Sequence, residues 1–162
     1  MPDSGSSPDR SNSRTAPVRT GIGYDSHRFA PGGTMLLGGV EVASDLHLAG
    51  HSDGDAVLHA LTDAILGAAA AGDIGALFPD TDPANKNRDS AQMLETAVSR
   101  VANAGFSIVN ADITVIAERP KIGQHRDAMC ERIATILGVS KGDVSVKGKT
   151  NERMGWIGAG EG

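Results

Sequence analysis

Two short segments carry aspartate and histidine side chains at spacings that suit a bound metal ion. Asp25 and His27 are two residues apart in a segment of extended character, so their side chains point the same way. His59 lies four residues after Asp55 and four before Asp63 on a predicted helix, which places them on one face. A carboxylate beside an imidazole can fix the tautomer of the ring. Two histidines and one aspartate recur as ligands of catalytic zinc, with a fourth position left open.

Each of these patterns also has a simpler explanation. An Asp-x-His segment occurs by chance, and an aspartate that caps a turn beside a surface histidine is common. The alternative for the helix face around His59, less favoured than a ligand, is a solvated acidic face with an incidental histidine. His47 and His125 are interpreted as surface residues, and Cys130 as a buried thiol in a helix.

Two later segments could bind a phosphate group and a nucleotide base. Lysines, Thr150 and Glu152 follow one another within residues 147–152, and a glutamate beside phosphate oxygens suits Mg²⁺ or Mn²⁺. In residues 117–123, Pro120 stiffens a segment whose backbone groups could read a flat base edge. On spacing alone an ordinary polar loop is favoured for the first segment. A strand-to-helix connection explains the second equally well.

The composition limits the classes of function. The chain has 162 residues and a formal net charge of -5, which argues against binding nucleic acid. No apolar run approaches the length of a membrane span. The single cysteine excludes an internal disulfide and fits a reducing compartment, so we expect a cytoplasmic protein. Residues 1–18 are rich in Ser, Pro, Asp and Arg and lack the apolar stretch of a secretory signal, which predicts a disordered tail.

The elements that must position these residues follow from hydrophobic periodicity and from the helix-ending glycines. The pattern predicts an extended segment over 18–24, a bent strand or hairpin over 35–42, a helix from Ser52 or Asp53 to Ala71, a turn-rich loop over 73–82, a helix over 90–104, a strand over 106–118, a helix over 124–137 and a strand over 143–147. Mixed strands and helices at this length predict a two-layer α/β sandwich, a mixed β-sheet with helices on one face.

Several longer motifs stand in a fixed order along the chain: Gly23 to His27, Ala49 to Asp55 continuing through His59 to Asp63, Gly72 to Gly75, and Phe78 to Asp82. Together they resemble the 2-C-methyl-D-erythritol 2,4-cyclodiphosphate synthase family of the non-mevalonate isoprenoid pathway. The resemblance runs from about Val18 to Gly162. It implies a homotrimer whose sheets face the threefold axis and whose active sites lie at subunit interfaces.

The resemblance also implies a reaction and a set of site residues. A phosphorus-oxygen lyase would convert 4-diphosphocytidyl-2-C-methyl-D-erythritol 2-phosphate to the cyclic 2,4-diphosphate and CMP. Zinc would bind at Asp25, His27 and His59, and Mg²⁺ or Mn²⁺ at Glu152 with the substrate phosphates. His51 and Thr150 would be catalytic and stabilise the transition state. The residues implied to bind the substrate are Asp25, His27, His51, Ser52, Asp73, Gly75, Phe78, Asp80, Asp82, Ala117, Pro120, Lys121, Gly123, Lys149, Thr150, Glu152 and Trp156.

The chain departs from the pattern of this family in three places. Ala159 stands where the family commonly has an arginine, and residues 148–152 are less rich in threonine, although Thr150 and Glu152 keep their positions. The family usually continues past Gly162 with another strand. We therefore expect a domain over 19–162 that lacks the last strand, and an exposed sheet edge that would weaken trimer assembly.

Three other functions are compatible with these residue types. A zinc-dependent phosphohydrolase would use the same ligands to activate water. A non-catalytic module would bind nucleotide and metal without turnover. A structural trimer would retain the residues as a vestigial site.

Overall fold

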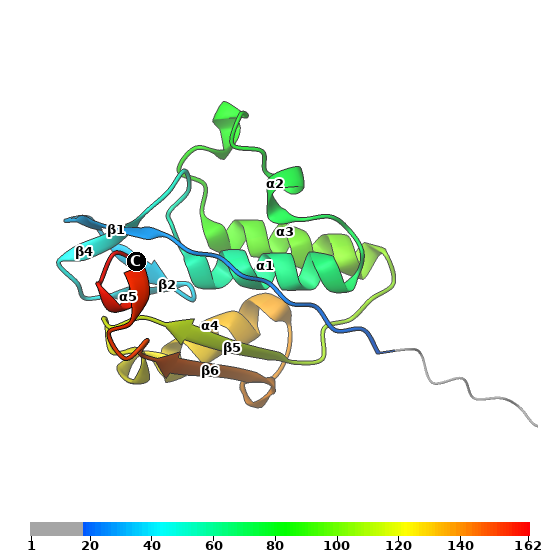
Figure 1. Ribbon diagram of the computed structural model, residues 1–162. Helices are drawn as coiled ribbons and strands as arrows, with labels where there is room; N and C mark the ends of the chain where they lie inside the picture. Colours follow the sequence, from blue (N-terminus) through cyan, green and yellow to red (C-terminus); the bar gives the residue numbers. More distant parts are fainter. Residues whose placement is uncertain (1–17) are drawn as a thin grey trace, which may run out of the picture.

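Three two-stranded sheets and three long helices form the core of the computed structural model, which describes residues 18–162 (Figure 1). The predicted tail over 1–18 therefore lies, except for Val18, outside the described residues. The strands pair as β1 (Arg28–Pro31) with β4 (Leu46–Ala49), β2 (Met35–Leu37) with β3 (Val40–Val42), and β5 (Ala111–Ile116) with β6 (Val144–Lys149). The helices are α1 (Ala56–Ala68), α2 (Ile74–Leu77), α3 (Ser90–Asn103), α4 (Arg126–Leu137) and α5 (Gly155–Gly158), with 3-10 turns at Pro83–Asn85, Ile122–Gln124 and Lys141–Asp143.

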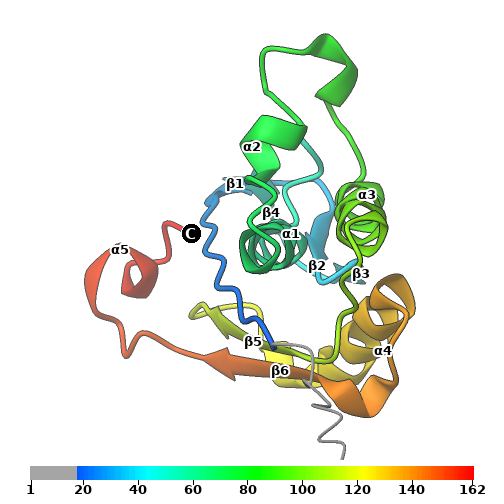
Figure 2. The ribbon, with the colours of Figure 1, turned by 90° about the vertical axis from the view of Figure 1, so that its right-hand side faces the viewer.

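The long helices α1, α3 and α4 lie on the same side of the β5–β6 sheet, as Figure 2 shows. Their apolar faces meet in one core, in which Leu66 of α1, Leu94 of α3 and Ile133 of α4 are all 0% exposed. The β5–β6 pair is parallel and the other two pairs are antiparallel. The predicted class, a mixed α/β fold with helices against one face, is confirmed. The strands form separate pairs rather than one continuous sheet.

The extended segment that precedes β1 lies directly on α1. A Cβ atom on Gly23 would lie 1.8 Å from the carbonyl oxygen of Ala60, and one on Gly21 would lie equally close to that of Ala64. Only glycine permits so close an approach of two backbones. The segment that carries Asp25 is thereby held against the helix that carries His59.

Helix α1 begins at Ala56, because Asp55 is its N-cap rather than the predicted Ser52 or Asp53. The Asp55 carboxylate accepts two backbone N–H groups of the first helical turn, both at 3.1 Å. It also accepts two N–H groups from the turn of the β2–β3 hairpin, at 2.9 and 2.6 Å. The hairpin predicted over 35–42 is confirmed, and a side chain that is 1% exposed joins it to α1.

The other predicted elements are present with shifted ends. Helices α3 and α4 match the predictions to within two residues, whereas β5 is shorter than the predicted strand over 106–118 and β6 extends two residues further than predicted. The loop predicted over 73–82 contains the short helix α2. Cys130 is buried in α4, as predicted, and His47 and His125 are half-buried rather than fully exposed. Within residues 18–162 no helix combines the length and apolar character that crossing a membrane requires.

Candidate metal centre

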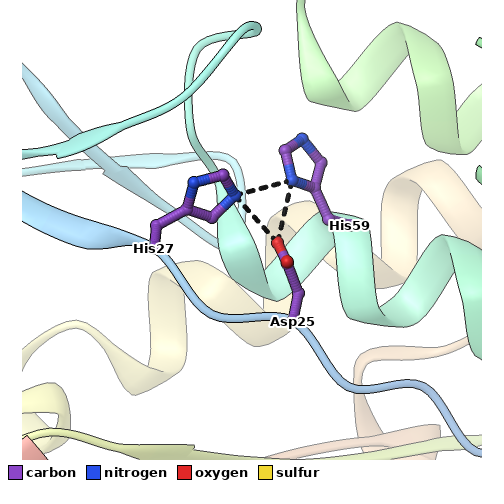
Figure 3. A group of neighbouring side chains, drawn as sticks. All are labelled: Asp25, His27 and His59. Atoms are coloured by element: carbon purple, nitrogen blue, oxygen red, sulfur yellow. Dashed lines mark hydrogen bonds and ion pairs between the residues drawn. The ribbon is translucent and has the colours of Figure 1, made fainter. Parts of the chain in front are cut away.

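Asp25, His27 and His59 converge on one point, as Figure 3 shows. Asp25 Oδ2 lies 2.9 Å from His27 Nε2 and 3.0 Å from His59 Nδ1. The two ring nitrogens are 3.2 Å apart. Asp25 and His27 come from the segment before β1, and His59 comes from the first turns of α1. The predicted meeting of three ligand side chains from a strand-like segment and a helix is confirmed.

The ring of His27 is held with one nitrogen turned toward this point. Its Nδ1–H donates to the carbonyl oxygen of Ala49 at 2.8 Å, which leaves Nε2 as the free donor atom for a cation. Gly50 lies against the same ring, because a Cβ atom there would be 2.8 Å from Cε1 of His27. The end of β4 therefore orients the ring and leaves no space for a larger residue.

The donor set fits a small divalent cation. Four ligands at about 2.0–2.1 Å from a tetrahedral zinc ion are about 3.3 Å from one another. The three ligand atoms here are 2.9 to 3.2 Å apart, so an ion requires each of them to move by only a few tenths of an ångström. One carboxylate and two imidazoles are ligands that zinc shares with other transition metals. Three protein ligands leave a fourth position for substrate.

The same contacts shift the protonation of the cluster. Burial opposes ionisation of Asp25, but hydrogen bonds and charge from His27 and His59 outweigh it and hold the pKa of the carboxyl well below its usual range. The hydrogen bond to Asp25 is the main cause that raises the pKa of His27, against the opposing effect of burial. Without a cation, the cluster therefore pairs a carboxylate with a histidine that holds its proton more firmly than usual.

This coupling predicts that zinc binding weakens as the pH falls. A cation must displace the proton on His27, and a raised pKa keeps that proton bound up to a higher pH than in an ordinary histidine. The affinity should be fully developed above the raised pKa and fall about tenfold per pH unit below it, because one proton competes with one cation. Competition with a chromophoric chelator between about pH 8 and pH 6 measures this slope. An affinity that does not change over this range would contradict the prediction.

The sequence pattern suggested that Asp55 or Asp63 orients the ring of His59, and this prediction is wrong. The Asp55 carboxylate caps α1, and Asp63 accepts the N–H of Ile74 at 2.7 Å. Neither contacts the ring of His59. Its Nε2 lies instead 3.0 Å from Ser52 Oγ and 2.8 Å from Ser90 Oγ. Ser52 is among the residues that the resemblance implies, whereas Ser90 stands 31 positions from His59 and no sequence signal links the two.

The predicted nucleotide segment and phosphate loop meet at a second pocket. This pocket lies where β5 and β6 end. Six of the residues predicted to bind the substrate line it: Ala117, Pro120, Lys121, Gly123, Lys149 and Thr150. Next to it, Thr150 Oγ1 donates to Glu152 at 2.6 Å. Glu118 accepts the N–H groups of Asn151 and Arg153, both at 3.0 Å, and so holds this loop to the end of β5. The sequence gives no signal for this role of Glu118, because only the fold brings its carboxylate to that loop.

The remaining predicted residues lie in two other places. Trp156 lines a largely apolar pocket between the extended segment and β5, together with Asp25 and His27. Asp73 caps α2 by accepting the N–H of Ala76, and Gly75 lies in that helix. Phe78 is buried under Arg88, while Asp80 and Asp82 are exposed in the following loop. His51 is exposed next to Ser52.

The fold and this site define an α/β protein with three side chains arranged as ligands that could hold a metal ion. The sequence profile of the YgbB family matches residues 18–162, and the chain belongs to that family. The predicted resemblance to cyclodiphosphate synthases is thereby confirmed. The chain is 64% identical to 2-C-methyl-D-erythritol 2,4-cyclodiphosphate synthase of Gemmatimonas aurantiaca, over 90% of this chain and 87% of the relative.

Solved structures show the same similarity. The bifunctional IspDF of Campylobacter jejuni superposes with a TM-score of 0.85 and 44% identity over 88% of this chain, which spans 39% of that longer protein. A 2C-methyl-D-erythritol-2,4-cyclodiphosphate synthase in its CDP-bound form superposes with a TM-score of 0.79 and 39% identity. That match covers 83% of this chain and 89% of the other.

Proposed function

We propose that the chain is a 2-C-methyl-D-erythritol 2,4-cyclodiphosphate synthase, a phosphorus-oxygen lyase of non-mevalonate isoprenoid biosynthesis. It converts 4-diphosphocytidyl-2-C-methyl-D-erythritol 2-phosphate to the cyclic 2,4-diphosphate and CMP. The observation that carries the proposal is the convergence of Asp25, His27 and His59 in a chain that is 64% identical to a synthase of that name. The chain has a net charge of -5, and the substrate carries a diphosphate and a further phosphate. Bound cations are therefore needed to offset the repulsion between the two.

The reaction is an intramolecular phosphoryl transfer. An oxygen of the 2-phosphate forms a bond to the β-phosphorus, the bond from that phosphorus to the CMP oxygen breaks, and CMP leaves with the electron pair. The nucleophile is already an anionic oxygen, so the protein supplies no nucleophile of its own. Its task is to fold the substrate and offset crowded negative charge. Zinc bound at the cluster supplies Lewis acidity at phosphoryl oxygens.

The residues of the chain divide this task between three places. The exposed imidazole of His51 and the hydroxyl of Ser52, next to the cluster, contact a phosphate of the substrate. The exposed Lys149 lines the second pocket and donates to the diphosphate, and the Thr150 hydroxyl turns from Glu152 to donate to the same group. His51 and Thr150 stabilise the transition state from their two places. Residues 117–123 hold the cytidine against the same pocket. Asp73, Gly75 and the loop from Phe78 to Asp82 enclose the erythritol hydroxyls, and Trp156 packs beside the substrate.

The active form is proposed to be a homotrimer in the cytoplasm, with its sheets toward the threefold axis. The similarity of the chain to the synthase family supports this assembly, whereas within one chain Asp25 and His27 already share the apolar pocket with Ala117 and Pro120. A single, buried cysteine suits a reducing compartment. Sedimentation velocity measures the assembly, and a monomer that turns over substrate would refute it.

Product analysis tests the reaction. The protein is incubated with the diphosphocytidyl substrate, zinc and magnesium, and the products are followed by phosphorus NMR. A cyclic diphosphate with CMP supports the synthase. An open phosphate would indicate the zinc-dependent phosphohydrolase, and nucleotide binding without turnover would indicate the non-catalytic module.

Glu152 is proposed to bind a second cation, Mg²⁺ or Mn²⁺, together with the substrate phosphates. Its carboxylate is exposed next to the second pocket and accepts only from Thr150 among the described side chains. Glu152→Gln removes the charge and keeps the size, so we expect about a tenfold higher magnesium concentration at half-maximal rate. Zinc affinity should not change. Glu131→Gln on α4 is the matched control, and equal magnesium titrations for the two variants would contradict the assignment.

A further inference from the structure

The nitrogen of His59 that faces away from the cation cluster ends a buried hydrogen-bond chain. Its Nε2 lies 2.8 Å from Ser90 Oγ, and the Ser90 hydroxyl is in turn bonded to Asp53 Oδ1. The N–H of Ser90 donates to the other oxygen, Asp53 Oδ2, at 3.0 Å. Ser90 is 0% exposed and is the first residue of α3. The chain therefore connects the start of α3 to the histidine of α1.

The direction of this chain follows from its carboxylate end. An ionised carboxylate accepts hydrogen bonds and has no proton to donate, so the Ser90 hydroxyl must donate to Asp53. The Ser90 oxygen then has only lone pairs to offer His59, which requires the ring proton to be on Nε2. Nδ1 is thereby left without a proton, and Nδ1 is the atom that faces Asp25 and His27.

We propose that Ser90 and Asp53 are positioning residues that hold His59 in the tautomer able to bind a cation. They contact neither the cation nor the substrate and act only through the ring of His59. The inference rests on the cation site of the proposed function but not on the cyclisation reaction. In this arrangement Ser90 orients the ring of His59 in the way that the Ala49 carbonyl orients the ring of His27.

Ser52 is the weaker partner for the same nitrogen. Its Oγ lies 3.0 Å from His59 Nε2 and also accepts the N–H of Gly54 at 3.2 Å, and no carboxylate fixes the direction of its hydroxyl. The three residues do not form a nucleophilic triad either. In such a triad the histidine lies between the serine and the aspartate, whereas here the serine lies between the other two and is fully buried.

Asp53→Asn tests the direction of the chain with almost no change in shape. The Ser90 N–H fixes the amide oxygen at the Oδ2 position, so the amide NH₂ takes the Oδ1 position and donates to the Ser90 hydroxyl. That hydroxyl must then donate to His59, which moves the ring proton to Nδ1 and blocks the cation. The variant also loses a 3.3 Å contact from the N–H of Asp55. We expect zinc affinity to fall about 10–100-fold.

The tautomer itself is read directly. Long-range proton–nitrogen NMR of the zinc-free protein distinguishes a protonated from an unprotonated ring nitrogen. We expect His59 to carry its proton on Nε2 in the unaltered protein and on Nδ1 in Asp53→Asn. A change that only loosened the fold would leave no preference for Nδ1. The same tautomer in both proteins would overturn the proposal.

Ser90→Ala tests the middle of the chain, with Thr62→Val as the control. Thr62 is also 0% exposed, lies on α1 and donates only to the carbonyl of Leu58, so the control removes a buried hydroxyl that does not touch the histidine. Chelator competition should show zinc affinity about 10–100-fold lower for Ser90→Ala and unchanged for Thr62→Val. Equal affinities for the two variants would overturn the proposal.

Failure of the reaction and failure of this inference give different results. If the unaltered protein binds zinc and the variants lose affinity while no cyclic product forms, the positioning role stands and the synthase proposal fails. If the protein forms product but both variants bind zinc as the unaltered protein does, the synthase stands and the positioning role is overturned. A protein that binds no zinc at the cluster would overturn both.

Discussion

His59→Ala is expected to lower the turnover of the diphosphocytidyl substrate by about a thousandfold, because loss of a Lewis acid removes several kcal/mol of transition-state stabilisation. The variant removes one of the three donor atoms that lie within 4.8 Å of one another. Two ligands from a single extended segment then remain, and zinc should no longer copurify. The measurements are turnover by phosphorus NMR and zinc content by elemental analysis.

The fold should survive this substitution, because α1 is anchored by other contacts. Leu58 and Leu66 on the same helix are at most 1% exposed, and the N-cap at Asp55 does not involve the ring of His59. His47→Ala is the matched control, since the His47 ring is half-buried and bonds only the carbonyl of Gly32. Near-normal turnover by zinc-depleted His59→Ala would show that this residue is not a ligand of the catalytic ion.

Asp55→Ala is expected to lower the free energy of unfolding by about 3–5 kcal/mol, the sum of a lost N-cap and of buried N–H groups left without an acceptor. The carboxylate is 1% exposed and serves the first turn of α1 and the β2–β3 hairpin at the same time. Water cannot replace an acceptor at such a depth, so most of the lost bonds stay unmade. Urea unfolding followed by circular dichroism, at one fixed protein concentration, measures the change.

Asp89→Ala gives the matched comparison. Asp89 is also a helix N-cap, but it is exposed and its side chain accepts only the N–H of Ala91, at 2.8 Å. Its loss should cost about 1 kcal/mol, the usual value for a cap that water can partly replace. An Asp55→Ala variant no less stable than Asp89→Ala would mean that the contacts of Asp55 with the hairpin contribute nothing.

Most of the elements could be predicted because their signals are local. The apolar spacing of Met93, Leu94, Ala97 and Val101 gives the α3 helix, and all four are buried on one face. The Gly38–Gly39 pair between apolar residues gives the β2–β3 hairpin. The predicted ends of the elements were less accurate. The N-cap of α1, for example, is Asp55 because the β2–β3 hairpin packs over that carboxylate. Three aspartates or serines near its start could cap it equally well in an isolated chain.

The residues of the cation cluster could also be predicted. Asp25 and His27 are two residues apart in an extended segment, so their side chains point the same way. The supporting residues of the cluster could not be predicted. Helical spacing placed Asp55 and Asp63 one turn from His59, but the ring turns away from both and toward Ser90 at the start of α3. The spacing of residues on α1 cannot indicate that a hydroxyl from α3, that of Ser90, contacts the ring of His59.

By itself, the sequence determined which residues form the candidate cation cluster and where the three long helices and the strands β2, β3, β5 and β6 lie. Both depend on side-chain types and on periodicities that act within a few residues. Tertiary structure alone decided which nitrogen of each histidine faces the cluster. It also decided that Asp55 bonds to the hairpin and that Ser90 bonds to His59. These choices depend on contacts between residues as far as 37 positions apart, as in the bond from Ser90 to Asp53. Such contacts form only when the packing of α1, α3 and the extended segment has fixed the path of the backbone.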